Sequence, residues 1–160
     1  MKSIVVYFSL EGNSKYVADR IAEYVGADTL GLEPVKKYPT GNVSKFVWGG
    51  KSVVFGDKPK LLPYKFDAKD YDVIIIGTPV WAGTFAPPLK TFLREHDLSH
   101  KKVALYACCG GGSTEKCIDN LKKELKNCEI IGSFSLVDPG QKQSEENIQT
   151  IKAFCSKHLS

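Results

Sequence analysis

Hydrophobic residues in this chain fall into short continuous runs, separated by stretches in which they recur every three or four positions. The runs at 4–8, 73–76, 103–108 and 130–137 are rich in β-branched and aromatic residues. Consecutive rather than alternating apolar residues are typical of strands buried on both faces. A weaker strand is expected at 28–33. Helices are expected at the periodic stretches, which begin near Ser14, Pro87 and Thr114 and, for the last helix, cover about 144–157.

Strands and helices alternate along the chain, which favours an α/β fold with a parallel sheet and helices on both faces. The length of 160 residues fits a single domain spanning 1–160. Only the stretch from 34 to 66 departs from the alternation, because four prolines and four glycines interrupt it. We expect a short helix near 43–54 within this long excursion, and an excursion of such length is usually functional or separately packed.

Composition and charge exclude several classes of protein. Hydrophobic residues make up 42% and charged residues 25% of the chain, as in globular proteins. No apolar run is long enough for a membrane-spanning helix, and the N-terminus has no signal-peptide pattern, so a cytoplasmic protein without membrane attachment is expected. The net charge of +4 comes from scattered lysines and arginines, which argues against nucleic-acid binding. The five cysteines lack metal-site spacing, and Cys117, Cys128 and Cys155 are expected to act as small buried hydrophobes.

The candidate chemistry lies in the loops that follow three of the strands, at 9–14, 78–85 and 108–114. Ligands of open parallel sheets bind beyond the carboxyl ends of the strands. These loops contain one charged residue, Glu11, among glycines, hydroxyls, amides and apolar groups. This inventory suits neither acid–base catalysis nor metal binding, and no catalytic residue is expected. It suits a flat cofactor held largely by backbone groups.

The segment Ser9-Leu10-Glu11-Gly12-Asn13-Ser14 directly follows a strand and opens a helix. Backbone N–H groups at a helix start favour an anion, Gly12 allows a close approach, and the hydroxyl and amide side chains can donate hydrogen bonds. No lysine or arginine is present, so the segment is not a nucleoside-triphosphate loop. Two interpretations stay open: a phosphate site, or a helix that Asn13 or Ser14 simply caps.

Three segments together, SLEGNS, GTPVWAGTFAPP and ACCGGGST, give the chain a resemblance to flavodoxin-like FMN-binding proteins over nearly its whole length. Glu11 stands where a hydroxyl residue is usual. The resemblance implies a three-layer sandwich around a five-stranded parallel sheet of order 2-1-3-4-5, and FMN as the cofactor. It also implies the cofactor-binding residues, which are Ser9, Leu10, Glu11, Gly12, Asn13, Ser14, Thr78, Pro79, Val80, Trp81, Ala82, Gly83, Cys108, Gly110, Gly111 and Gly112.

Two functions remain open on this resemblance. One is an electron carrier that docks on a redox partner protein, and the alternative is an NAD(P)H-dependent FMN oxidoreductase acting on a quinone or a similar small acceptor. Flavodoxins are typically acidic and carry a second stacking aromatic after strand four, whereas this chain is basic and has no aromatic residue at 108–116. Their peptide beside the loop tryptophan, here between Ala82 and Gly83, reorients to accept a hydrogen bond from the reduced flavin. Cys108 and Cys109 would lie at the edge of the flavin, but a vicinal pair is a poor dithiol.

Overall fold

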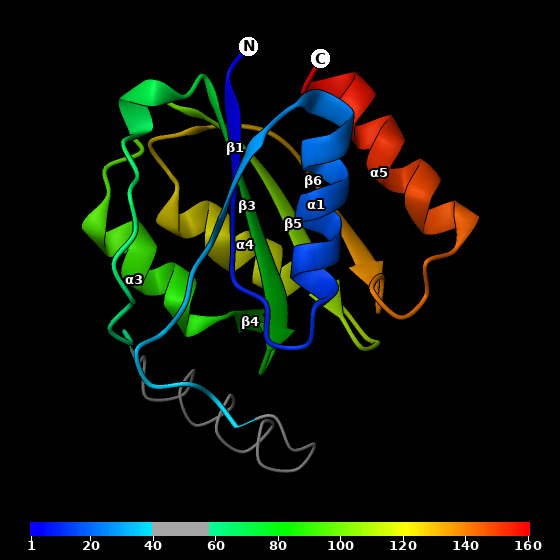
Figure 1. Cartoon of the computed structure of the whole chain (residues 1–160), viewed down its shortest axis with the longest axis horizontal. Coiled ribbons are helices and arrows are strands. Elements are labelled where there is room, and N and C mark those ends of the chain that lie inside the picture. The colour runs from blue at the N-terminus through cyan, green and yellow to red at the C-terminus, as the bar shows by residue number, and fades with distance from the viewer. Residues whose placement is uncertain (40–57) are drawn as a thin grey trace.

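A parallel sheet of five strands forms the centre of the computed structural model, which describes residues 1–39 and 58–160 (Figure 1). The helix expected near 43–54 lies outside the described residues. The order across the sheet is β2-β1-β3-β5-β6, which confirms the predicted order 2-1-3-4-5 of the five parallel strands. The strands are β1 (Ser3–Tyr7), β2 (Asp28–Gly31), β3 (Val73–Trp81), β5 (Lys102–Cys109) and β6 (Glu129–Val137).

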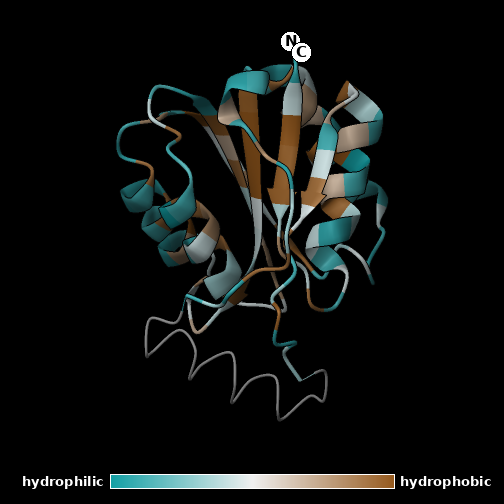
Figure 2. Cartoon of the chain, turned by 60° about the vertical axis from the view of Figure 1, so that its left-hand side comes forward, coloured by the Kyte–Doolittle hydropathy of each residue, from teal (hydrophilic) through white to brown (hydrophobic). Residues whose placement is uncertain are grey.

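Helices cover both faces of this sheet, as the alternating pattern predicts. The helices are α1 (Asn13–Val25), α3 (Pro87–Glu95), α4 (Glu115–Glu124) and α5 (Glu145–His158), with one short 3-10 turn, η1 (Ala68–Asp70). One apolar cluster joins α1 and α5 to the sheet, and a second joins α3 and α4 to its other face. The three-layer sandwich is therefore confirmed. Figure 2 shows the hydrophobic strands enclosed between helices that are more polar on their outer sides.

The strand β3 is the centre of both clusters. Val73, Ile74, Ile75 and Ile76 are each 0% exposed, and they point alternately to the two faces. Full burial of such a side chain contributes about 1.5–3 kcal/mol relative to leaving it exposed. A strand with one solvent-exposed face would place every second residue of such a run in water. A strand between two helical layers buries all four apolar residues.

The segment 78–84 differs from the expected loop. β3 continues as far as Trp81, and the chain returns through Ala82 and Gly83 into a short antiparallel strand, β4 (Thr84–Phe85). The expectation is wrong here because threonine, valine, tryptophan and phenylalanine favour extended backbone, and two residues with positive φ suffice for the turn. This hairpin holds Trp81 on a strand end rather than on an open loop.

The carboxyl ends of β1, β3 and β5 meet at one edge of the sheet, where the strand order reverses between β1 and β3. Tyr106 ties this edge to α1, because its fully buried hydroxyl donates a hydrogen bond to the Ser14 carbonyl oxygen at 2.7 Å. Gly77 makes room for the Tyr106 ring, which a Cβ at this position would approach to 1.9 Å. Among the described helices, none has the length and apolarity needed to cross a lipid bilayer.

Candidate functional site

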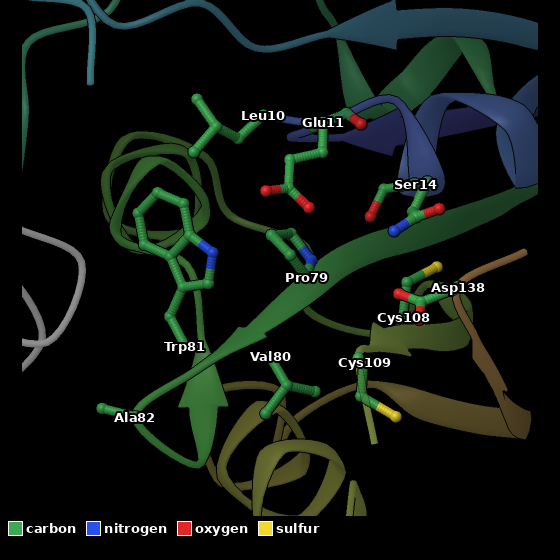
Figure 3. A pocket seen from close by; sticks show the side chains of 13 residues that line it. Leu10, Glu11, Ser14, Pro79, Val80, Trp81, Ala82, Cys108, Cys109 and Asp138 are labelled. Atoms are coloured by element: carbon green, nitrogen blue, oxygen red, sulfur yellow. The ribbon is translucent and has the colours of Figure 1, made fainter. Parts of the chain in front are cut away.

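A cavity of about 180 Å³ opens at this edge of the sheet (Figure 3). Its wall comes from the segment after β1, from the last residues of β3 and β5 with the residue that follows each, and from the residue after β6. The lining residues are Ser9, Leu10, Glu11, Asn13, Ser14, Pro79, Val80, Trp81, Ala82, Cys108, Cys109, Gly110 and Asp138. Most of the predicted cofactor-binding residues are therefore brought together around one space.

Five predicted site residues do not line the cavity. Gly12, Gly83, Gly111 and Gly112 all have positive φ and act as turning points of the lining loops. Thr78 is 0% exposed, and its hydroxyl is used within the protein. It accepts a hydrogen bond from the Ala86 N–H at 3.0 Å and donates one to the Pro79 carbonyl at 2.7 Å. Thr78 therefore joins β3 to the start of α3.

The first turn of α1 is arranged to receive an acceptor group. Gly12, with φ 98°, is the N-cap residue, and no side chain caps the helix. Its own N–H donates to the Ser9 hydroxyl at 3.1 Å, while the Asn13 side-chain oxygen accepts from the Gly140 N–H at 2.9 Å. The hydroxyl of Ser14 is buried and has no hydrogen-bond partner among the described residues. The capping interpretation is thus not what the structure shows, and a buried hydroxyl without a partner at a helix N-terminus fits an anion.

Two carboxylates also line the cavity. Glu11 was predicted, and Figure 3 shows its side chain pointing from the 9–14 segment toward Pro79. Asp138 was missed, because the sequence analysis considered only the loops after three strands. Its φ of 42° is fixed by its N–H, which donates to the Cys109 carbonyl at 2.9 Å, and by its own carbonyl, which accepts from the N–H of Lys142 at 2.7 Å. The signal available in the sequence was the turn-forming Asp138-Pro139-Gly140 directly after a strand.

Residues 2–139 match the family model of flavodoxin. The chain belongs to the flavodoxin family. FMN is the cofactor of this family, as the resemblance in the sequence predicts. No curated protein matches this chain in sequence.

Solved structures similar to this flavodoxin include a flavoprotein from Bacteroides eggerthii, with 25% identity, a TM-score of 0.79 and coverage of 99% of this chain and 98% of the other. A flavoprotein from Lactobacillus acidophilus, solved in complex with FMN, is 21% identical, with a TM-score of 0.75 and coverage of 89% and 96%. Oxidised flavodoxin 1 from Bacillus cereus is 17% identical, with a TM-score of 0.61 and coverage of 99% and 97%. The last two likenesses show the shared fold.

Burial raises the pKa of four cysteine thiols in this chain, those of Cys108, Cys117, Cys128 and Cys155. Burial raises the pKa of the Cys108 thiol to about 12, although the nearby Ser14 hydroxyl acts to lower it. Burial likewise raises the pKa of Cys117 to about 12 and that of Cys155 to about 11. Cys117 and Cys155 are buried as expected, whereas Cys128 is only half-buried. Because a thiol reacts as the thiolate, these environments do not favour cysteine chemistry at neutral pH.

The wall formed after β5 is unusually bare. Gly110, Gly111 and Gly112 are exposed, and Cβ atoms added at Gly111 and Gly112 would meet nothing within 4 Å. On the opposite side, Figure 3 shows the Trp81 indole rising from the end of β3. The cavity therefore has the Trp81 indole in its wall, and at the end of β5 Gly110 lines it beside Cys108 and Cys109.

Proposed function

We propose that this chain is an FMN-dependent redox protein whose cofactor phosphate binds at the start of α1. The observation that carries the proposal is the buried Ser14 hydroxyl without a partner, beside a helix N-terminus that no described side chain caps. The helix dipole and the unbonded N–H groups of the first turn attract an anion without any lysine or arginine. FMN, when bound, supplies a ring system that accepts electrons singly or in pairs.

The other lining residues have separable tasks in this proposal. Ser9 and Asn13 already hold the loop through their bonds to Gly12 and Gly140, so they fix the shape of the phosphate cradle. Trp81 provides the aromatic surface for the ring system, and the wall at 108–110 provides backbone groups on the other side. Glu11 and Asp138 bring carboxylate oxygens, which accept hydrogen bonds from hydroxyl and N–H groups of a ligand.

The phosphate assignment is tested by comparing FMN with riboflavin, which lacks the phosphate. We expect Ser14→Ala to weaken FMN binding by about 1–3 kcal/mol, the range for a hydrogen bond to a charged group, and to leave riboflavin binding nearly unchanged. Gly12→Val should abolish FMN binding, because φ 98° is unfavourable for a β-branched residue. The measurement is flavin fluorescence quenching on titration of the apoprotein.

Ser144 provides a matched control for this experiment. It is the N-cap of α5, and its hydroxyl accepts from the Asn147 N–H at 3.2 Å. Ser144→Ala should cost about 1 kcal/mol of stability through the lost cap and leave both flavin affinities unchanged. Equal affinities of the unmodified protein for FMN and riboflavin would refute the phosphate site.

The exposed glycines after β5, Gly110 to Gly112, favour a second candidate function. This is an oxidoreductase in which NAD(P)H or a quinone-like acceptor reaches the flavin directly. Gly110 offers a test, because a Cβ there meets only the Asp138 carboxylate at 3.8 Å, an ordinary contact. If small molecules enter at this wall, Gly110→Tyr should slow NAD(P)H oxidation at least about tenfold by filling it, whereas Gly110→Ala should not. If the chain is instead an electron carrier, the unmodified protein should exchange electrons with a partner protein, and adding NAD(P)H should not change the rate of this exchange.

A further inference from the structure

Three aromatic rings from separate parts of the chain meet behind the cavity. The Trp81 ring lies 4.9 Å from the Tyr38 ring and 5.4 Å from the Phe8 ring, measured between centroids, and both pairs are edge-to-face at 87°. Phe8 and Tyr38 also contact each other, at 5.8 Å and 66°. Edge-to-face packing at these distances is the favoured arrangement of aromatic pairs. The three rings thus form a closed cluster, which we call the Trp81 support.

The members of the Trp81 support differ in what they face. Trp81 lines the cavity, whereas neither Phe8 nor Tyr38 is among its lining residues. Phe8 is 3% exposed at the end of β1 and gives the cluster a buried base. We therefore expect Tyr38 to act on a ligand in the cavity through the indole of Trp81.

The segment that carries Tyr38 is itself held in place. Pro34 and Leu61 form an antiparallel bridge, flanked by hydrogen bonds from the Val35 N–H to the Lys60 carbonyl at 2.8 Å and from the Leu62 N–H to the Glu33 carbonyl at 2.7 Å. Tyr38 follows three residues after Val35 and half-buries its ring against Trp81. The two segments joined by this bridge thus fix the position from which the Tyr38 ring extends to Trp81.

We propose that Tyr38 is a positioning residue for the flavin site, holding the indole of Trp81 in the orientation that receives the ring system of FMN. The inference rests on the proposed function. It assigns a role in the site to Tyr38, a residue that lies far in sequence from the three loops of the site. Without the Tyr38 ring beside it, the Trp81 side chain would lose conformational freedom only when the ligand binds. Ordering it in advance removes this cost from the binding step.

The test is a double-mutant cycle between Tyr38 and Trp81, read by the dissociation constants of FMN and riboflavin. Tyr38→Leu should weaken both flavins by the same factor, about two- to tenfold, since the contact acts on the ring system that both share. The same substitution should have no further effect in a Trp81→Leu background. Tyr38→Phe, which keeps the ring, should bind both flavins as the unmodified protein does.

Tyr24 supplies the matched control, because it is an exposed tyrosine near the other end of α1. Tyr24→Leu should leave both dissociation constants unchanged. If Tyr38→Leu does not fold, Tyr38→Met keeps apolar bulk without the ring and takes its place in the cycle. The proposal is overturned if Tyr38→Leu does not weaken flavin binding. It is also overturned if Tyr38→Leu weakens flavin binding by the same factor in the Trp81→Leu background.

A flavin-free measurement separates this inference from the proposed function. With Trp48→Phe in every variant, Trp81 is the only tryptophan of the chain. Loss of the Tyr38 ring should then shift the Trp81 emission to longer wavelength and raise its quenching by acrylamide at least about twofold, because the supported indole becomes mobile and wet. Unchanged emission refutes the Trp81 support, whereas failure of the unmodified protein to bind FMN refutes the proposed function alone.

Discussion

The hairpin turn at Ala82 and Gly83 has a conformation that an alanine adopts only at a cost. Its φ values are 48° at Ala82 and 78° at Gly83. A two-residue hairpin with positive φ at both positions is a type I′ turn, for which Asn-Gly is the preferred pair. A Cβ in the left-handed region costs about 1–2 kcal/mol. The structure places this cost in the turn that follows Trp81.

Rotation of the Ala82–Gly83 peptide would cost still more. Turning the central peptide of a type I′ hairpin over converts it to type II′, whose first central position is a glycine position. Alanine there is held in a region that carries a penalty of about 1–3 kcal/mol. Alanine already costs about 1–2 kcal/mol in the existing turn, so only the excess, at most about 2 kcal/mol, lowers the population of the rotated turn relative to glycine. Since 1.4 kcal/mol is tenfold, this is a factor of up to about 30.

We therefore predict that Ala82→Gly increases the share of one-electron-reduced flavin during stepwise reduction, and that Ala82→Asn does not. Asparagine tolerates the left-handed region, so it stabilises the existing turn by up to about 1 kcal/mol, but its Cβ still opposes the rotated form. The assay is an anaerobic reductive titration followed by absorbance, with thermal unfolding of each apoprotein alongside. Nearly complete one-electron-reduced flavin in the unmodified protein, or an equal gain with asparagine and glycine, would refute this reasoning.

Four further predictions concern groups at this edge of the sheet. Thr78→Val should lower the free energy of unfolding by about 1–3 kcal/mol, because the buried Ala86 N–H loses its acceptor, and riboflavin and FMN affinities should keep their ratio. Gly77→Ala should lower the melting temperature more than Thr78→Val does, since its Cβ would lie 1.9 Å from the Tyr106 ring. Cys108, with its pKa raised to about 12 by burial, should resist iodoacetamide at pH 8 in the folded protein, as mass spectrometry can show. The same raised pKa stabilises the fold only below the thiol's ordinary pKa of 9.0, so unfolding measured across pH 9–12 should become easier as the pH rises.

The parallel sheet could be predicted because burial between two helical layers leaves a direct trace in the sequence, whereas the order of its strands came from the resemblance to flavodoxin-like proteins. Four consecutive apolar residues at 73–76, with helices before and after them in the chain, indicate a strand that is buried on both faces. The hairpin at 78–85 leaves a weaker trace. Its strand signal is short, contains Pro79, and ends in a turn whose first residue is alanine rather than the asparagine or glycine that would have announced it.

The site was predictable where one loop carries its own chemistry, as Gly12 and Ser14 do. Asp138 and Tyr38 were missed for a different reason, since the turn-forming residues at 138–140 predict a turn but not the cavity that it lines. Asp138 enters the cavity because β6 lies beside β5 and its turn is fixed by a bond to Cys109. Tyr38 reaches Trp81 because the bridge between Pro34 and Leu61 directs the chain across the end of β1. Both placements depend on contacts between distant segments, which no local pattern encodes.

We propose that two independent features of the cavity favour two-electron exchange over one-electron transfer. A carrier gains when the turn beside its flavin can rotate, and Ala82 makes this rotation costly. A carrier is also expected to cover both sides of its flavin with side chains, and the exposed Gly110 brings none to the cavity wall. If these features served unrelated ends, replacing one would leave the effect of the other unchanged. If they serve one two-electron exchange with a small molecule, combining Ala82→Gly with Gly110→Tyr should restore one-electron behaviour more fully than either substitution alone.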